Sequence, residues 1–272
     1  MLDAFDQKKD HILKEIGANS ESHLDASPKG TIDIFCIPII NEINGNPNYV
    51  TTSSCSGRVS VFLEGIKHNE DTTAQIGAKG YEGRWVFVTH DPDELPLWYD
   101  NVKFIYQDQN YKELTPNTRY LLYKYEPLIL HVKCRDTKLA TALYTTAMNC
   151  GFRESGIGSN NVVAIRISIK LDVPFGYLEE SLGSLVSFVT RDYLEVLTKL
   201  SDDRFKENFR KMNQLHQAIA ALSLSSDGVN HLTSKQETRE ERRLRKMQLG
   251  LAKREEIREL KKRAKEAKEE VQ

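Results

Sequence analysis

A run of small hydroxyl side chains, closed by glycine and arginine, is the feature of this sequence best suited to bind a ligand. The run is Thr51 to Arg58, which reads TTSSCSGR. Small side chains leave backbone N–H groups open, so hydroxyls, amides and a guanidinium together can hold a carboxylate, a phosphate or a sugar hydroxyl. A Ser/Gly-rich turn without a ligand explains the same residues. Cys55 also permits a nucleophile, although no histidine or acidic residue stands at a diagnostic spacing from it.

Two further sets of residues have side chains that handle protons or anions. His90 and Asp91 follow a predicted strand end, where histidine can exchange a proton near neutral pH and aspartate can orient it. An aspartate that starts a turn before Pro92 is the alternative. The second set lies on one face of the predicted strand Tyr120 to Cys134, because period two aligns its side chains. The members of this basic face are His131, Lys133 and Arg135. Solvent exposure at a sheet edge is an alternative explanation that needs no ligand.

A glycine-rich loop, Gly151 to Asn161 (GFRESGIGSNN), contains a GxG pattern. Dinucleotide-binding loops follow a strand and open a helix, whereas this loop follows a predicted helix and leads into a strand. The common nucleotide-binding fingerprint therefore fails here. Any nucleotide-like cofactor must bind by another geometry.

The elements that must position these residues alternate between strand and helix patterns. The interleaving predicts an α/β or α+β domain, built on a single mixed sheet with flanking helices. Apolar spacing predicts helices from Leu2 to about Gly17 and over Lys138 to Cys150, with two more between Glu179 and Leu224. Pro38 makes a helix uncertain within the apolar run Ile32 to Ile43. The predicted strands are Tyr49 to Leu63 (two strands or a bent one), Arg84 to Thr89, Tyr120 to Cys134 (interrupted by Pro127) and Asn161 to Lys170.

Composition restricts the class of protein further. The 272 residues are 39% hydrophobic and 28% charged, which suits one sizeable domain with or without an extension. We expect a cytoplasmic chain, because no apolar run approaches the roughly 20 residues of a membrane span and the N-terminus lacks a signal-peptide pattern. No metal site is predicted, since no CxxC pair occurs among the four separated cysteines, which are Cys36, Cys55, Cys134 and Cys150.

The charge is unevenly distributed along the chain. From Ser234 onward there are 14 basic and 9 acidic residues, which leaves the remainder with an excess of acidic groups. This asymmetry is a hint of a polyanionic partner, although a solvated helix or disorder explains the charge run as well. We predict a folded domain over residues 1–224, a linker over 225–236 and a charged, helical or disordered tail over 237–272.

Six separated blocks, in a fixed order, resemble the wybutosine-synthesis tRNA methyltransferase family. The resemblance covers about residues 1–220, and fungal-type members carry charged C-terminal extensions like the one seen here. Six blocks in the family's order are a specific signal, whereas any one alone would be weak. The blocks are Ser27 to Asp33 (SPKGTID), Tyr49 to Phe62 (YVTTSSCSGRVSVF), Trp85 to Pro92 (WVFVTHDP), Lys124 to Asp136 (KYEPLILHVKCRD), Gly151 to Ser159 (GFRESGIGS) and Ile165 to Gly176 (IRISIKLDVPFG).

This resemblance implies a methyltransferase domain with a non-Rossmann fold. The implied reaction transfers a methyl group from S-adenosylmethionine to N-4 of the tricyclic wybutosine precursor, at the guanosine 3′ of the anticodon in phenylalanine tRNA. The protein would then mainly align the nitrogen with the methyl carbon and remove a proton. The implied partners are phenylalanine tRNA and other wybutosine-pathway enzymes, with no membrane.

Site residues are carried over only within the matched blocks. His90 and Asp91 are expected to handle the proton or hold the base. The residues expected to bind the cofactor are Ser54, Ser56, Gly57, Arg58 and Ser155, and those expected to bind the substrate are His131, Arg135, Arg153 and Glu154.

Two other classes of function are compatible with parts of the sequence. A non-catalytic tRNA-binding module of the same pathway would use the basic strand face and the tail but transfer nothing, so it need not bind S-adenosylmethionine. A thiol enzyme built on Cys55 would lose its activity on alkylation.

Overall fold

The computed structural model describes residues 3–22, 32–66, 82–106, 114–115, 117–226 and Met247. Contacts divide the chain into two units, Met1–Ser225 and Ser226–Gln272. Most of the predicted linker and tail lies outside the described residues, so the predicted domain limits stay predictions. Within the described ranges, no helix is long and apolar enough to cross a bilayer.

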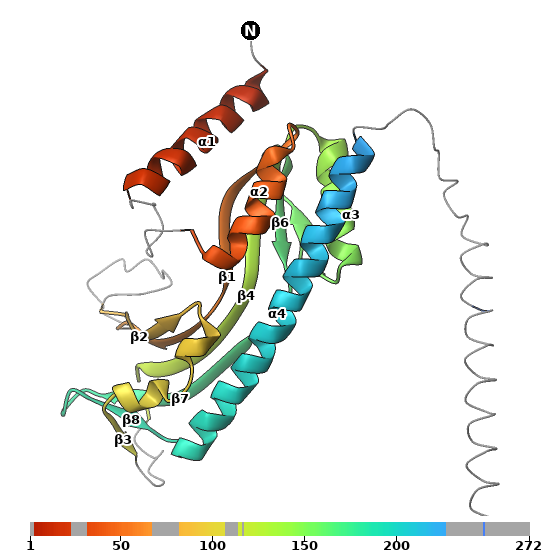
Figure 1. Ribbon diagram of the computed structural model, residues 1–272. Helices are drawn as coiled ribbons and strands as arrows, with labels where there is room; N and C mark the ends of the chain where they lie inside the picture. Colours follow the sequence, from red (N-terminus) through yellow and green to blue (C-terminus); the bar gives the residue numbers. More distant parts are fainter. Residues whose placement is uncertain are drawn as a thin grey trace, which may run out of the picture. The chain divides into compact units, whose positions relative to one another are not determined.

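Two long antiparallel strands form the centre of one mixed sheet (Figure 1). They are β1 (Tyr49–Leu63) and β4 (Tyr120–Cys134), paired from end to end. The strand order is β2-β1-β4-β7-β8-β3, and β6 pairs with β4 and β5 off this path. The β3–β8 pair is parallel, whereas the other pairs are antiparallel. The shorter strands are β2 (Arg84–Thr89), β3 (Phe104–Tyr106), β5 (Gly156–Ile157), β6 (Val162–Arg166), β7 (Leu171–Glu179) and β8 (Ser184–Ser187).

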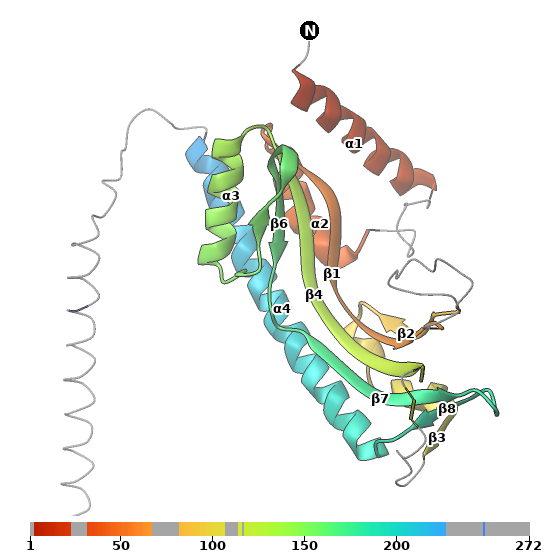
Figure 2. The same cartoon turned by 180° about the vertical axis from the view of Figure 1, so that it is seen from behind.

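Three helices cover one face of this sheet (Figures 1 and 2). They are α2 (Ile37–Gly45), α3 (Thr137–Asn149) and α4 (Arg191–Ser226). One apolar core cluster lies between these helices and the β4–β6 end of the sheet, and a second lies between α4 and the strands β1, β4 and β7. The predicted mixed-sheet, non-Rossmann α+β fold is therefore confirmed. The remaining helical segments are α1 (Ala4–Ser22) and the 3-10 turns η1 (Ile34–Cys36), η2 (Pro92–Glu94), η3 (Trp98–Asn101) and η5 (Ser159–Asn161).

The central strands bend where Gly57 of β1 lies opposite Pro127 of β4. Proline has no N–H to donate, and Gly57 has φ +110°, which favours glycine. The neighbouring residues Ser56 and Leu128 leave the ladder, and the buried Asn208 of α4 bonds both backbones instead. Its Nδ2 donates to the Ser56 carbonyl at 2.7 Å and its Oδ1 accepts from the Leu128 N–H at 2.9 Å. Tyr49–Leu63 is thus one bent strand, and β4 continues through its proline.

Two expectations about helices are wrong. The stretch predicted as two helices contains β8 and then a single 36-residue helix that begins at Arg191. Apolar residues such as Leu185 and Val186 fit helical spacing, but they pair with β7 and β3, and such non-local pairing overrides local propensity. The first helix also continues past Gly17 to Ser22. Pro38 is accommodated, since it lies in the first turn of α2.

Candidate functional site

The sheet divides where β2 separates from β1, and three reactive side chains meet there. The β1–β2 ladder runs only from Leu63↔Arg84 to Val59↔Thr89, and His90 is the next residue of the chain. Cys55 lies on β1 beyond that point, and Asp33 precedes η1. We call Asp33, Cys55 and His90 the fork cluster. One potential ligand atom from each of the three lies within 4.8 Å of the others.

Asp33 and His90 form the most sheltered pair in the fork cluster. Asp33 Oδ2 is 3.8 Å from His90 Nε2, and the side chains are 6% and 16% exposed. The same carboxylate oxygen accepts the Ser56 N–H at 2.9 Å, so a backbone group of β1 fixes its position. A carboxylate held in place 3.8 Å from a sheltered imidazole is an arrangement suited to proton transfer.

Cys55 has donor chemistry suited to a metal but lies in surroundings that keep it protonated. One thiol, one imidazole and one carboxylate are ligand types that zinc accepts. Burial raises the pKa of the Cys55 thiol, and Asp33 adds to the effect against an opposing hydrogen bond to the Gly57 backbone. Metal binding and nucleophilic attack both use the thiolate. The cluster is therefore better suited to holding a proton than to thiol chemistry.

Asp91, the neighbour of His90, has a local structural task. Its Oδ1 accepts the Asp93 N–H at 2.9 Å and so caps η2. This is the turn-starting arrangement that the sequence left open as an alternative. A catalytic part for Asp91 remains a prediction.

Arg58 lies three residues along β1 from Cys55, on the face of the sheet turned away from α4. We call this the open face. Arg58 Nε donates to Glu126 Oε2 at 2.7 Å, and the guanidinium lies 5.2 Å from the centre of the Trp85 ring. A carboxylate and an aromatic ring therefore orient the guanidinium. At Gly57, an added Cβ would lie 3.1 Å from the Glu126 carbonyl, which favours glycine.

Most of the other predicted site residues lie on β4 or in the turn before β5, and both of these strands pair with β6. His131 of β4 contacts Ser53, which belongs to the hydroxyl run of β1, and Arg166, which was not among the predicted site residues. The Ser155 hydroxyl donates to the Phe152 carbonyl at 2.7 Å and accepts the Arg166 N–H at 3.1 Å, so it shapes the turn before β5. The remaining two are exposed: Glu154 pairs with Lys170 at 2.9 Å, and Arg153 lies beside it in the chain.

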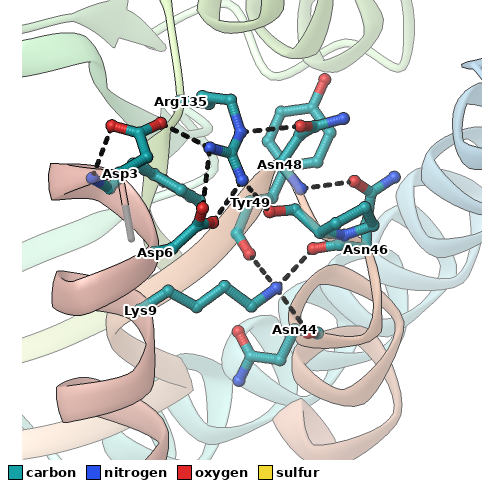
Figure 3. Close-up of polar contacts among 10 residues, drawn as sticks. Asp3, Asp6, Lys9, Asn44, Asn46, Asn48, Tyr49 and Arg135 are labelled. Atoms are coloured by element: carbon teal, nitrogen blue, oxygen red, sulfur yellow. Dashed lines mark hydrogen bonds and ion pairs between the residues drawn. The ribbon is translucent and has the colours of Figure 1, made fainter. Parts of the chain in front are cut away.

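Arg135 is not brought together with the fork cluster. It follows the end of β4 and pairs with Asp3 at 2.6 Å and with Asp6, both near the start of the chain (Figure 3). Its backbone N–H bonds the Asn48 carbonyl, seven residues before Cys55 and hence about 23 Å away along a strand. Substrate binding by Arg135 remains a prediction.

Lys9 of α1 completes this second polar group, which we call the α1 cluster: Asp3, Asp6, Lys9 and Arg135. Lys9 is 9% exposed, and its ammonium donates to the carbonyls of Asn44, Asn46 and Tyr49 (Figure 3). Burial, followed by the charge of Arg135, lowers the pKa of Lys9. The contacts join α1 to the start of β1.

Sequence reasoning missed Asp33, although its block was part of the resemblance. Asp33 is 22 residues from Cys55 and 57 from His90 in the chain, so no local spacing connects them. The signal available was an acidic residue closing the SPKGTID block. Residues 27–31 of that block lie outside the described residues.

The fold and the fork cluster together define a class of protein: an α+β domain whose reactive groups gather where the sheet divides. The part of the chain that the structure describes contains no Rossmann nucleotide loop. A family model described as Methyltransferase TYW3 matches residues 7–221. The chain therefore belongs to the TYW3 methyltransferase family, as the sequence resemblance predicted. Membership makes it a methyltransferase and implies a methyl donor.

Individual relatives agree with this assignment. The chain is 51% identical over 259 residues to tRNA wybutosine-synthesizing protein 3 of Saccharomyces cerevisiae, covering 91% of this chain and 93% of that protein. It is 38% identical over 220 residues to the protein of the same name from Schizosaccharomyces pombe, covering 79% and 86%. Among solved structures, the PH1069 protein from Pyrococcus horikoshii OT3 has a TM-score of 0.59 at 27% identity, over 81% of this chain and 96% of that one.

Proposed function

We propose that this chain uses S-adenosylmethionine to methylate N-4 of the tricyclic wybutosine precursor, at the guanosine 3′ of the anticodon in phenylalanine tRNA. Family membership and the names of the two fungal relatives support a methyltransferase of this pathway. The structural observation that carries the proposal is the sheltered Asp33–His90 pair beside the hydroxyl run of β1.

The residues near the fork cluster fit the groups of such a donor, which has a carboxylate, an ammonium group and ribose hydroxyls. Arg58 offers a guanidinium, Asp33 a carboxylate and Ser54 a partly exposed hydroxyl. Among the described residues, the buried hydroxyl of Ser56 has no hydrogen-bond partner. Donors and acceptors of both charge signs therefore lie along one stretch of β1 and its edge.

The bound donor would supply a methyl group already activated on a sulfonium. The chain's own residues then have to align the ring nitrogen and take up the proton that it loses on methylation. His90 is assigned to hold this proton, and Asp33 to stabilise the resulting imidazolium. Opposite charges about 4 Å apart attract by about 4 kcal/mol at an effective dielectric constant of 20, before desolvation is subtracted.

Phenylalanine tRNA is the proposed macromolecular substrate, and its phosphates would contact lysine and arginine side chains. The basic stretch from Ser234 onward adds non-specific attraction that weakens as salt rises. Deleting residues 234–272 should lower tRNA affinity and flatten its salt dependence. An unchanged affinity and salt slope would leave that stretch without a binding role.

A methyl-transfer assay tests the reaction directly. The full chain is incubated with isotope-labelled S-adenosylmethionine and phenylalanine tRNA from cells that lack this protein, and the nucleosides are analysed by mass spectrometry. Wild type should add one methyl group at N-4. His90→Gln should slow the transfer 100-fold or more, the usual contribution of a general base.

The matched control for this assay is His11→Gln. His11 lies on α1, is 62% exposed and contacts Glu15, so its loss should leave the rate unchanged. A wild-type rate in His90→Gln would remove His90 from the mechanism. Absence of N-4 methylation by wild type would refute the proposed reaction itself.

A further inference from the structure

A third polar group lies on the open face, and its member on β1 is two residues from Cys55 of the fork cluster. Ser53 of β1 and Ala164 of β6 flank His131 of β4 in the two adjoining ladders. Ala164 has only a methyl side chain, so Arg166, the next residue on that face of β6, can reach the imidazole. The Ser53 hydroxyl is 2.7 Å from His131 Nδ1, and Arg166 Nη2 is 3.3 Å from His131 Nε2.

These contacts fix the direction of the hydrogen bonds. A guanidinium can only donate, so Arg166 donates and His131 Nε2 accepts. A ring nitrogen that accepts carries no proton, which makes His131 neutral with its proton on Nδ1. That proton is donated to the Ser53 oxygen, and the Ser53 O–H is left to donate elsewhere. Burial and, second, the charge of Arg166 lower the pKa of His131, which agrees with the neutral form.

The group therefore presents N–H and O–H donors and a positive charge to the open face. Arg166 is exposed, and within the described ranges no carboxylate forms an ion pair with it. Arg58 of β1 is in contrast paired with Glu126, and Lys170, between β6 and β7, is paired with Glu154. A cationic cluster of O–H and N–H donors is the chemistry that recognises an oxyanion.

We propose that Ser53, His131 and Arg166 form an oxyanion-binding subsite for a substrate of the methyl transfer. This inference rests on the proposed function, which offers two sources of the oxyanion: a phosphate of the RNA or the carboxylate of the methyl donor. Ser53 is two residues from Cys55 on the same strand, about 6.6 Å away. The subsite therefore anchors one end of a substrate whose reacting part lies at the fork cluster.

The test compares Arg166→Gln with Arg210→Gln. Arg210 is an exposed arginine on α4, paired with Glu207, so its variant also removes one positive charge. Affinity for S-adenosylmethionine is measured by calorimetry. Affinity for phenylalanine tRNA is measured by filter binding at several salt concentrations.

Arg166→Gln should weaken one of the two affinities about tenfold or more, the effect of losing a charge-assisted hydrogen bond. A loss of donor affinity alone assigns the carboxylate. A loss of tRNA affinity, with a salt slope lower by about one phosphate contact, assigns the phosphate. Ser53→Ala should weaken the same affinity by a smaller factor, and Arg210→Gln should change neither. If Arg166→Gln leaves both affinities within twofold of wild type, the subsite does not exist.

A sulfate titration separates failure of the subsite from failure of the proposed function. If wild type binds neither S-adenosylmethionine nor tRNA, the proposed function fails, and the subsite is then judged by the NMR signal of the His131 ring. A saturable shift of that signal with sulfate, absent in Arg166→Gln, supports the subsite. No shift in wild type overturns it.

Discussion

Arg135, which follows the end of β4, and Arg166 of β6 have opposite surroundings. Arg135 donates to the carboxylates of Asp3 and Asp6, to Asn48 and to the Pro47 carbonyl. Among the described residues, the Arg166 side chain forms one hydrogen bond, to a neutral histidine. The first arginine is satisfied within the protein, whereas the second has four N–H donors left for something else.

The α1 cluster and the fork cluster differ in the kind of groups that they bring together. The three protons of the Lys9 ammonium match three backbone carbonyls, so this group stabilises the docking of α1. At the fork, one ligand atom each of a carboxylate, a thiol and an imidazole lie within 4.8 Å of one another, and such groups can exchange protons. We infer that the α1 cluster supports the fold and that the fork cluster supports chemistry. This division gives contrasting expectations for substitutions in the two clusters.

Replacing one carboxylate by an amide in each cluster should give the largest contrast in the rate of methyl transfer. Asp33→Asn keeps an acceptor for the Ser56 N–H but removes the charge beside His90, so methyl transfer should slow about 100- to 1000-fold, or about 3–4 kcal/mol. Asp6→Asn in the α1 cluster should leave the rate within twofold. Single-turnover rates measure both, and equal rates in the two variants would contradict the division.

Whether the sequence could predict a feature of this structure depends on how far apart in the chain the interacting residues lie. Strand β2 and helix α3 follow from local periodicity, and both are confirmed nearly to the residue. The fork cluster depends on the pairing of β1 with β2 and on the fold of the chain before α2. Asp33 and His90 therefore carry no mutual signal in the sequence, and the approach of Arg166 to His131 depends in the same way on the β4–β6 register.

Removing the buried ammonium of the α1 cluster should lower stability and leave catalysis intact. Lys9→Met keeps the length of the side chain but leaves three carbonyls without their donor, which costs about 3 kcal/mol if water only partly replaces it. Lys8→Met is the control, because Lys8 is exposed on the same helix. Urea unfolding gives the free energies. A loss of activity in folded Lys9→Met would mean that the α1 cluster also serves the reaction.

Disrupting the bend at Gly57 and Pro127 should lower stability less than removing the Lys9 ammonium does. Asn208→Ala removes the amide that bonds the Ser56 carbonyl and the Leu128 N–H, and we expect a loss of about 2 kcal/mol. Because Ser56 also positions Asp33, the rate should fall several-fold in addition. Asn213→Ala, one turn further along α4 at an exposed position, is the control. Stability without a change in rate would show that the fork cluster does not depend on the bend.

The smallest expected effect is a change in how stability depends on pH. Because the pKa of His131 is lowered in the folded protein, first by burial and then by Arg166, the unfolded chain binds more protons just below the ordinary histidine pKa of about 6.5. The contribution of His131 is therefore fully present above about pH 6.5 and declines as the pH falls toward its folded pKa.

Replacing His131 should make that decline shallower. His131→Asn keeps a donor for Ser53 but does not titrate, so urea unfolding at pH 7.5 and pH 5.5 should show a smaller difference than in wild type. His11→Gln is again the control, since the His11 imidazole is exposed and contacts Glu15 on the same helix. Equal declines in all three proteins would mean that His131 is not held neutral by Arg166. In that case the hydrogen-bond directions that leave the Ser53 O–H and the Arg166 guanidinium open to an oxyanion would lose their basis.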